Sequence, residues 1–188
     1  MNPARISYRT RQFFSYLGAK SARLEIDKVQ QLLNLRQLAL FQEMHKAEQL
    51  HSLEVFHRLI EAGETDPDLL VAALLHDVGK MLLPLHILER VWVVLAGAFL
   101  PGRVKIWGEG DHLQSVRQTS MPGDPPWWRK PFLTAQQHPA WGAELAAQAG
   151  CSTTSVALIR RHQAKLPGTP VTREDALLSK LQEVDDMN

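Results

Sequence analysis

The sequence has one cysteine and no long apolar run, and each absence excludes a class of protein. Cys151 is the only thiol among 188 residues, which rules out a disulfide framework and a cysteine-rich zinc site. The longest apolar run, VWVVLAGAFL at 91–100, has about half of the roughly 20 residues that a membrane-spanning helix needs. The first twenty residues lack the apolar core of a signal peptide. We therefore expect a soluble, cytoplasmic protein in which any bound metal uses histidine and carboxylate ligands.

The sequence also lacks an excess of charge of either sign. Lysine and arginine number 21 against 20 aspartates and glutamates, for a net charge of +1, so we expect no specific binding to nucleic acid. The exception is the N-terminus, where basic residues flank apolar ones: Arg5, Arg9, Arg11 and Lys20 around Phe13, Phe14, Tyr16 and Leu17. A basic amphipathic helix lies on a membrane surface or packs on its own domain, and we expect the second. The oligomeric state stays open.

Alternating strand patterns are scarce, and helical signals dominate the first half of the chain. Apolar periodicity predicts helices over 35–44, about 47–62 and 67–79, and a further apolar helix between Pro84 and Pro101. Asn34 is the expected N-cap of the helix over 35–44, and Asp66 that of the helix over 67–79. Gly63 is expected to end the helix over 47–62, and Gly79 the helix that Asp66 caps.

The second half resumes its helical pattern after an irregular stretch. Residues 102–131 are rich in Pro, Gly, Ser and Trp and have no clear period, which indicates a long insertion or a lid. Pro139 and Gly150 are the expected limits of the next helix. Hydroxyl residues then cap a helix from 152, and a capping box from Thr172 to Asp175 begins the last one. The prediction is an all-α, single-domain helical bundle of seven or eight helices, in which the helices of 1–46 pack on a core domain of 47–188.

Histidine and aspartate fall on the inner faces of several predicted helices. His51 shares a face with Val55 and Leu59, because residues four apart stack on a helix. The other inward positions are His76, His138, His162 and Asp185, with Asp186 an equal alternative to the last. Such groups are costly to bury unless something satisfies them. Each of them alone is explained by ordinary hydrogen bonding in the core; a cation inside the bundle would satisfy all of them together.

The adjacent pair His76-Asp77, in AALLHDVGK, needs its own explanation. Neighbouring helical residues point about 100° apart, so the two side chains cannot chelate an ion from one helix face. They reach a common ion only if it lies beside the C-terminal end of the helix. The alternative is a charged helix end at the surface.

The order His51, His76-Asp77, His138, His162 and Asp185 resembles the HD superfamily of metal-dependent phosphohydrolases, in particular small uncharacterised bacterial HD-domain proteins. The resemblance spans roughly residues 47–186. Its most specific parts are LLHDVGK, the H…G.ELA…G pattern from His138 to Gly150, and LIRRHQ.

The resemblance implies a defined site. His51, His76, Asp77 and Asp185 match the ligands of a first metal, Asp77 is able to bridge, and His138 and His162 match the ligands of a second. Lys80 matches a lysine that approaches the substrate or a bridging water, which makes Asp77 and Lys80 the expected catalytic residues. The implied cofactors are one or two transition-metal ions, namely iron, manganese, nickel, cobalt or zinc.

The implied activity is hydrolysis of a phosphomonoester or phosphodiester bond in a small, nucleotide-like substrate. Arg161 and Arg129 are candidate substrate contacts, and Trp127 and Trp128 either stack on a base or anchor the insertion. The His-His-Glu and Gly-Tyr-Pro signatures of the cyclic-dinucleotide branch are absent, since His162 is followed by QAKLPGTP. A di-iron oxygenase with the same ligands and a non-catalytic HD module that binds a ligand or partner are the alternatives.

Overall fold

Every regular element in the described part of the chain is a helix, which confirms the all-α prediction. The computed structural model describes residues 28–86, 89, 92, 93, 95, 96, 99, 101–109, 126–166 and 168–187. In chain order the elements are α3 (Leu35–Glu43), α4 (Lys46–Glu61), α5 (Pro67–Leu75), the 3-10 helix η1 (Val78–Leu82), α7 (Pro101–Gly108), α9 (Lys130–Gln148), α10 (Thr153–Arg161) and α11 (Arg173–Asp185). None of the described helices is long and apolar enough to cross a membrane. The basic N-terminal segment lies outside the described residues.

Four of the described helices begin at the capping residues that the sequence predicts. Asn34 accepts hydrogen bonds from the backbone of the first turn of α3, and Asp66 does the same for α5. Ser152 caps α10, and Thr172 forms a capping box with α11. Each side chain satisfies backbone N–H groups that have no partner within the helix.

Three predicted boundaries were wrong. The α-helix predicted to reach Gly79 ends at Leu75 and gives way to the tighter η1, since Asp77 has the bridge-region angles φ −96° and ψ 2°. The helix predicted to begin at Pro139 begins at Lys130, because a proline removes only one helical donor and packing against η1 and α10 holds the rest. Residues 101–108, mostly inside the predicted irregular stretch, form α7.

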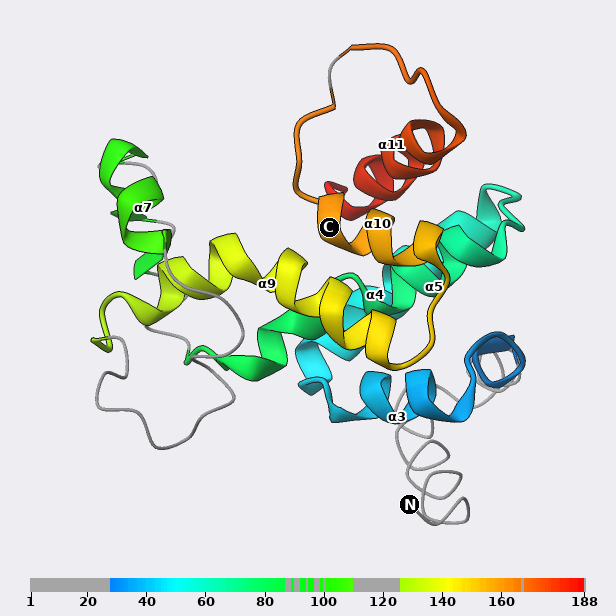
Figure 1. The fold of residues 1–188 in the computed structure, drawn as a ribbon, viewed down its shortest axis with the longest axis horizontal. Coiled ribbons are helices and arrows are strands. Elements are labelled where there is room, and N and C mark those ends of the chain that lie inside the picture. The colour runs from blue at the N-terminus through cyan, green and yellow to red at the C-terminus, as the bar shows by residue number, and fades with distance from the viewer. Residues whose placement is uncertain are drawn as a thin grey trace.

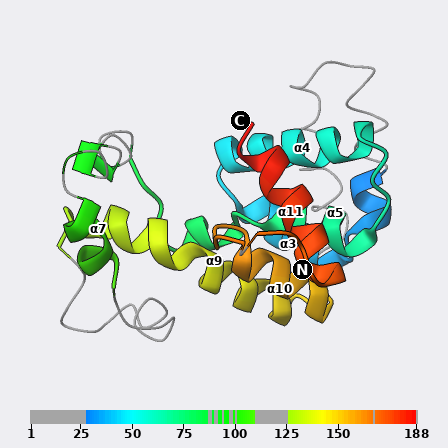
Figure 2. The same cartoon turned by 90° about the horizontal axis from the view of Figure 1, so that it is seen from above.

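The body of the molecule is built around α5, which is buried on every side. All residues from Leu69 to Leu75 are buried, and α4, α10 and α11 pack around them. Each leucine enclosed in this way stabilises the fold by about 1.5–3 kcal/mol. Figures 1 and 2 show α3, α4, α10 and α11 grouped around this helix. The end of α5, where His76 and Asp77 follow, is therefore held in the interior. The predicted division between 46 and 47 stays a prediction, although Leu38 and Phe41 of α3 share the core with α4 and α5.

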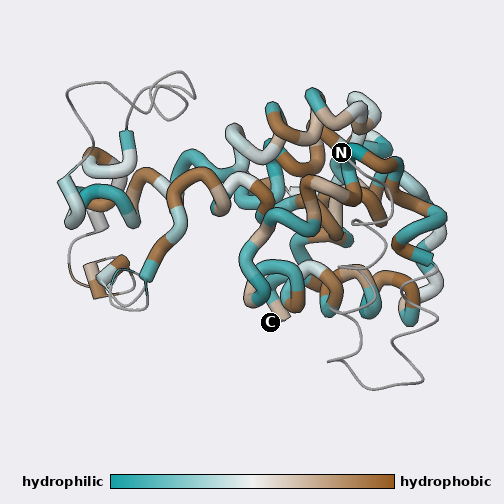
Figure 3. The backbone as a smooth tube through the Cα atoms, turned by 90° about the horizontal axis from the view of Figure 1, so that it is seen from below, coloured by the Kyte–Doolittle hydropathy of each residue, from teal (hydrophilic) through white to brown (hydrophobic). Residues whose placement is uncertain are grey.

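An arm extends from this body along α9. Helix α7 and the N-terminal half of α9 lie away from the other labelled helices (Figure 2). Hydrophobic segments run through both the body and the arm (Figure 3). Gln136 Nε2 donates to the carbonyl of Val104 at 2.9 Å, and Trp107 packs edge-on against Trp128. Trp128 thus anchors the arm, whereas Trp127 is 75% exposed.

Candidate metal centre

His76 and Asp77 converge because the helix changes its winding between them. His76 keeps α-helical angles, while Asp77 does not. Their side chains therefore approach each other, with His76 Nε2 3.6 Å from Asp77 Oδ2. Both residues are nearly inaccessible, at 0% and 3% exposure. The alternative of a charged surface end of a helix is excluded.

A first group of candidate ligands joins this pair to α4. The ligand atoms of His51, His76 and Asp77 all lie within 4.8 Å of one another, and the two Nε2 atoms are 3.2 Å apart. Asp185 adds a carboxylate from α11, with Oδ1 2.8 Å from His51 Nε2 and 3.4 Å from His76 Nε2. Asp186 is exposed and lies at the C-cap of α11. Of the two aspartates, Asp185 is the one beside the histidines.

A second group of ligands shares Asp77 and adds α9 and α10. The ligand atoms of Asp77, His138 and His162 also lie within 4.8 Å of one another, and the two histidine Nε2 atoms are 3.2 Å apart. Asp77 Oδ1 is 3.3 Å from His138 Nε2, whereas Asp77 Oδ2 faces the first group. The two carboxylate oxygens thus face two different sets of histidines, which is the arrangement of a bridging ligand.

Backbone carbonyls orient three of the four histidine rings. The Nδ1–H group of His76 donates to the carbonyl oxygen of Ala73 at 2.9 Å. In the same way, His138 donates to the carbonyl oxygen of Thr134 and His162 to that of Ile159, both at 2.8 Å. A carbonyl oxygen only accepts, so Nδ1 carries the proton and a neutral ring presents a lone pair at Nε2. Metal-binding histidines in proteins are oriented in the same way.

The charges around Asp77 favour a cation. Burial alone would raise the pKa of Asp77, but His76, His138 and Lys80 hold it well below its ordinary value. Burial, with His76 and His138 nearby, lowers the pKa of His162 to about 3, so this imidazole is neutral near pH 7. Burial would likewise lower the pKa of His76, yet Asp77 and Asp185 raise it. The same carboxylates that attract a proton to His76 attract a metal ion.

The donor set fits two transition-metal ions. In their neutral forms, His138 and His162 direct two Nε2 lone pairs at each other over 3.2 Å, beside a buried carboxylate. Such a contact is repulsive without a positive charge between or beside the rings. Imidazole nitrogens with carboxylate oxygens suit iron, manganese, cobalt, nickel or zinc, whereas magnesium and calcium favour all-oxygen sites.

Lys80 and a cavity complete the surroundings of the centre. Lys80 belongs to the 3-10 helix η1, and its Nζ lies 2.6 Å from Asp77 Oδ2. A cavity of ≈ 230 Å³ lies beside it, lined by His45, Glu48, Lys80, Pro84, Leu85, Val93, Thr134, Ala135, His138 and Gln163. Because Lys80 and His138 belong to both, the cavity opens directly on the centre.

The structure does not bring the two predicted arginines to the centre. Arg161 donates to the carboxylates of Glu174 and Asp175 on α11, the second at 2.7 Å. Arg129 donates to the carbonyl oxygens of Trp107, at 2.9 Å, and Glu109. The first ties α10 to α11 and the second ties α9 to α7.

Glu48, Gln163 and His45 were not among the predicted site residues. All three line the cavity. Glu48 precedes His51 by three positions on α4, a spacing that places two side chains on one helix face. This spacing was a usable signal for Glu48. No comparable signal pointed to Gln163, which lies just past the end of α10.

Comparison with known proteins agrees with the geometry. The model of the HD domain family matches residues 50–187, a range that contains all six candidate ligands. Neither the curated proteins nor the solved structures yield a match. A match over well over half of the chain establishes the family, and the chain belongs to the HD-domain family.

Proposed function

We propose that this protein is a metal-dependent phosphohydrolase that cleaves a phosphomonoester or phosphodiester bond in a small, nucleotide-like molecule. The observation that carries the proposal is the position of Asp77, which lies between two histidine pairs with Lys80 on one of its oxygens. Two adjacent cation sites flanked by a fixed ammonium group suit a substrate with several anionic oxygens.

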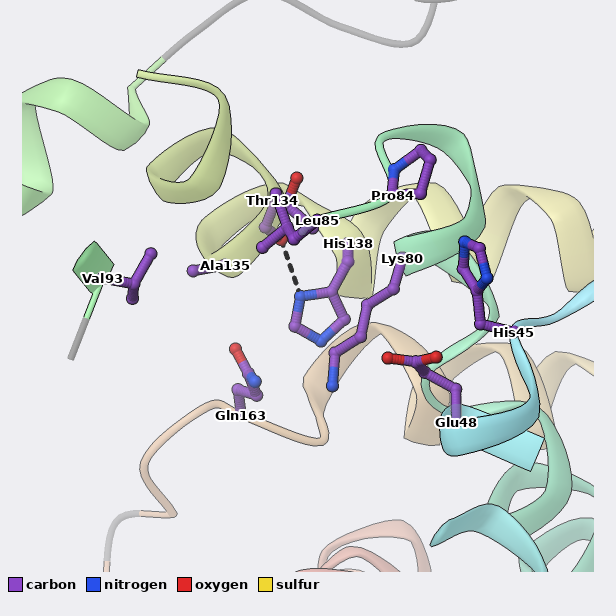
Figure 4. Close-up of a pocket in the computed structure, with 10 residues that line it drawn as sticks. All are labelled: His45, Glu48, Lys80, Pro84, Leu85, Val93, Thr134, Ala135, His138 and Gln163. Carbon is purple, nitrogen blue, oxygen red and sulfur yellow. Dashed lines mark hydrogen bonds between the residues drawn. The ribbon is translucent and has the colours of Figure 1, made fainter. Parts of the chain in front are cut away.

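The residues divide the work between holding metal and holding substrate. His51, His76, Asp77 and Asp185 would hold one ion, and Asp77, His138 and His162 the other. Ions held there would lower the pKa of a bound water and would attract the phosphoryl oxygens. Lys80 extends into the cavity (Figure 4), where its charge would stabilise the negative charge that develops on the phosphoryl group.

The reaction balances as a simple hydrolysis. The oxygen of one water molecule forms a bond to phosphorus, and the bond between phosphorus and the leaving oxygen breaks. The proton lost by the water ends on the departing oxygen. A monoester therefore gives an alcohol and inorganic phosphate, and no oxidant or reductant takes part.

The test pairs metal analysis with phosphate release. Protein purified without chelators is analysed by plasma mass spectrometry, loaded in turn with manganese, cobalt, nickel, iron or zinc, and assayed against a panel of phosphoesters. We expect the wild type to bind two ions per chain and to release phosphate. We expect Asp77→Asn to lose the two ions and the phosphate release. Asp186→Asn serves as the control, since this exposed neighbour of Asp185 changes the same functional group outside the centre.

Two results would overturn the proposal. One is the absence of phosphate release from every ester with every metal; the other is full activity of Asp77→Asn. Bound iron together with turnover that consumes oxygen would support the oxygenase alternative. Binding of a partner that is unchanged by metal removal would support the non-catalytic module.

A further inference from the structure

The cavity beside the centre has two unlike walls. Pro84, Leu85, Val93 and Ala135 form an apolar wall, while Glu48, His45 and Gln163 supply polar groups. Figure 4 shows Lys80 and His138 between the two, with their side chains directed toward the middle of the cavity. Any group that leaves from phosphorus at the centre is thus placed between an apolar surface and a polar one.

Glu48 is the acidic group of the polar wall. It lies in the first turn of α4 and is only 5% exposed. In Figure 4 its carboxylate points into the cavity on the side of Lys80. A carboxylate has room for about four hydrogen bonds, and hydrogen bonds to a charged acceptor in a site shielded from water are stronger than those between neutral groups. This wall favours a ligand that brings hydroxyl or amino donors.

The size and the charge of the cavity restrict that ligand further. Its volume of ≈ 230 Å³ is below the ~300–1,000 Å³ of pockets for drug-sized ligands. An alcohol with one ring therefore fits better than a dinucleotide. A second phosphate would place its negative charge beside Glu48, and like charges repel strongly where water is excluded.

We propose that the cavity binds the alcohol part of a small phosphomonoester and that Glu48 determines specificity by accepting hydrogen bonds from its hydroxyl or amino groups. The inference rests on the proposed function and narrows it from phosphoesters in general to monoesters of small, donor-rich alcohols. One ring of such an alcohol lies against Leu85 and Val93, and its donors face Glu48.

A matched pair of substrates tests the inference. Ribose 5-phosphate and tetrahydrofurfuryl phosphate are both esters of a primary alcohol on a five-membered oxygen ring, and only the first carries ring hydroxyls. The ratio of their kcat/KM values is measured for the metal-loaded wild type, Glu48→Gln and Glu54→Gln. Glu54→Gln is the matched control, because Glu54 lies on the same helix and its carboxylate binds Arg58 at the surface.

We expect the wild type to prefer ribose 5-phosphate, and Glu48→Gln to lower that preference at least tenfold while Glu54→Gln keeps it. An unchanged ratio in Glu48→Gln would overturn the inference, and so would an equal loss on both esters, which would place Glu48 in the support of the centre. Should Glu48→Gln misfold, Glu48→Asp withdraws the carboxylate by one methylene and is expected to lower the same ratio.

The two proposals fail in different ways. If the wild type hydrolyses neither these two esters nor any other phosphoester of the panel with any metal, the proposed function is wrong, and the cavity is judged by calorimetric binding of the same two esters. Tighter binding of ribose 5-phosphate to the wild type, with the difference lost in Glu48→Gln, would support the inference. Equal binding of both esters to both proteins would overturn it.

Discussion

Gly79→Ala is a direct test of how the two groups of ligands are held together. Gly79 lies on η1 where this element crosses α9. A Cβ atom added there would come within 2.0 Å of the carbonyl oxygen of His138 and 2.7 Å of the amide nitrogen of Gly142. Both obstacles are backbone atoms and cannot turn aside. To restore an ordinary contact of 3.4 Å, η1 and α9 must separate by about 1.4 Å.

The expected result is a selective loss at the second group of ligands. His138 moves with α9, whereas His51, His76 and Asp77 lie on the other side of the crossing. Metal ligands tolerate displacements of only about 0.2 Å, so we expect at least tenfold weaker binding of the second ion. Overpacking costs about 1–3 kcal/mol, which lowers the melting temperature by about 2–12 °C in a chain of this length.

Metal content after dialysis and thermal unfolding measure the two effects. Gly102→Ala is the control, because a Cβ there meets nothing within 4 Å and alanine stabilises a helix by about 0.5–1 kcal/mol relative to glycine. Gly142→Ala should fall between the two, since its nearest contact is 3.2 Å, to the backbone nitrogen of Gly79. Two tightly bound ions and an unchanged melting temperature in Gly79→Ala would refute the reasoning.

Three further predictions concern the bound metal and two residues outside the centre. Metal at a free concentration of 100 times its Kd stabilises the folded protein by about 2.7 kcal/mol, so its removal by a chelator should lower the melting temperature by about 5–11 °C. An unchanged melting curve would contradict a site formed only by the folded chain. Burial raises the pKa of Cys151 to about 11 from 9.0. Its alkylation by iodoacetamide at pH 8, measured by mass spectrometry, should therefore be about 100-fold slower than that of an exposed cysteine, and equal rates would contradict the burial. Arg161→Ala should leave KM within about twofold, because Arg161 binds Glu174 and Asp175; a tenfold rise in KM would show that it reaches the substrate.

Local chemistry made several helix starts predictable, whereas the ligand set followed from the resemblance to the HD superfamily. Asn34, Asp66 and Thr172 cap helices through hydrogen bonds that span two or three residues, and such contacts are visible in a sequence. The spacing of His51 and the other inward histidines predicted one shared site, and the structure brings them together around Asp77.

The errors come from contacts between residues distant in the chain. The end of α5 at Leu75 accompanies the close crossing of Gly79 and α9, and no periodicity within the helix reveals that crossing. Pro139 lies inside α9 because tertiary packing outweighs its missing donor. The partners of Arg161 depend on where α11 comes to lie, and the place of Glu48 in a cavity wall depends on segments that are distant in the chain.

The order of the ligands along the chain also sets the order in which a ribosome delivers them. His51, His76 and Asp77 emerge together with α4 and the end of α5, long before His138 and His162 on the next helices. Asp185, the fourth ligand of the first group, lies on α11 and emerges after all of them. A first ion would therefore meet its full set of ligands only once the last of the described helices has been made. Uptake of that ion would thus follow synthesis of the whole domain, and would not guide it.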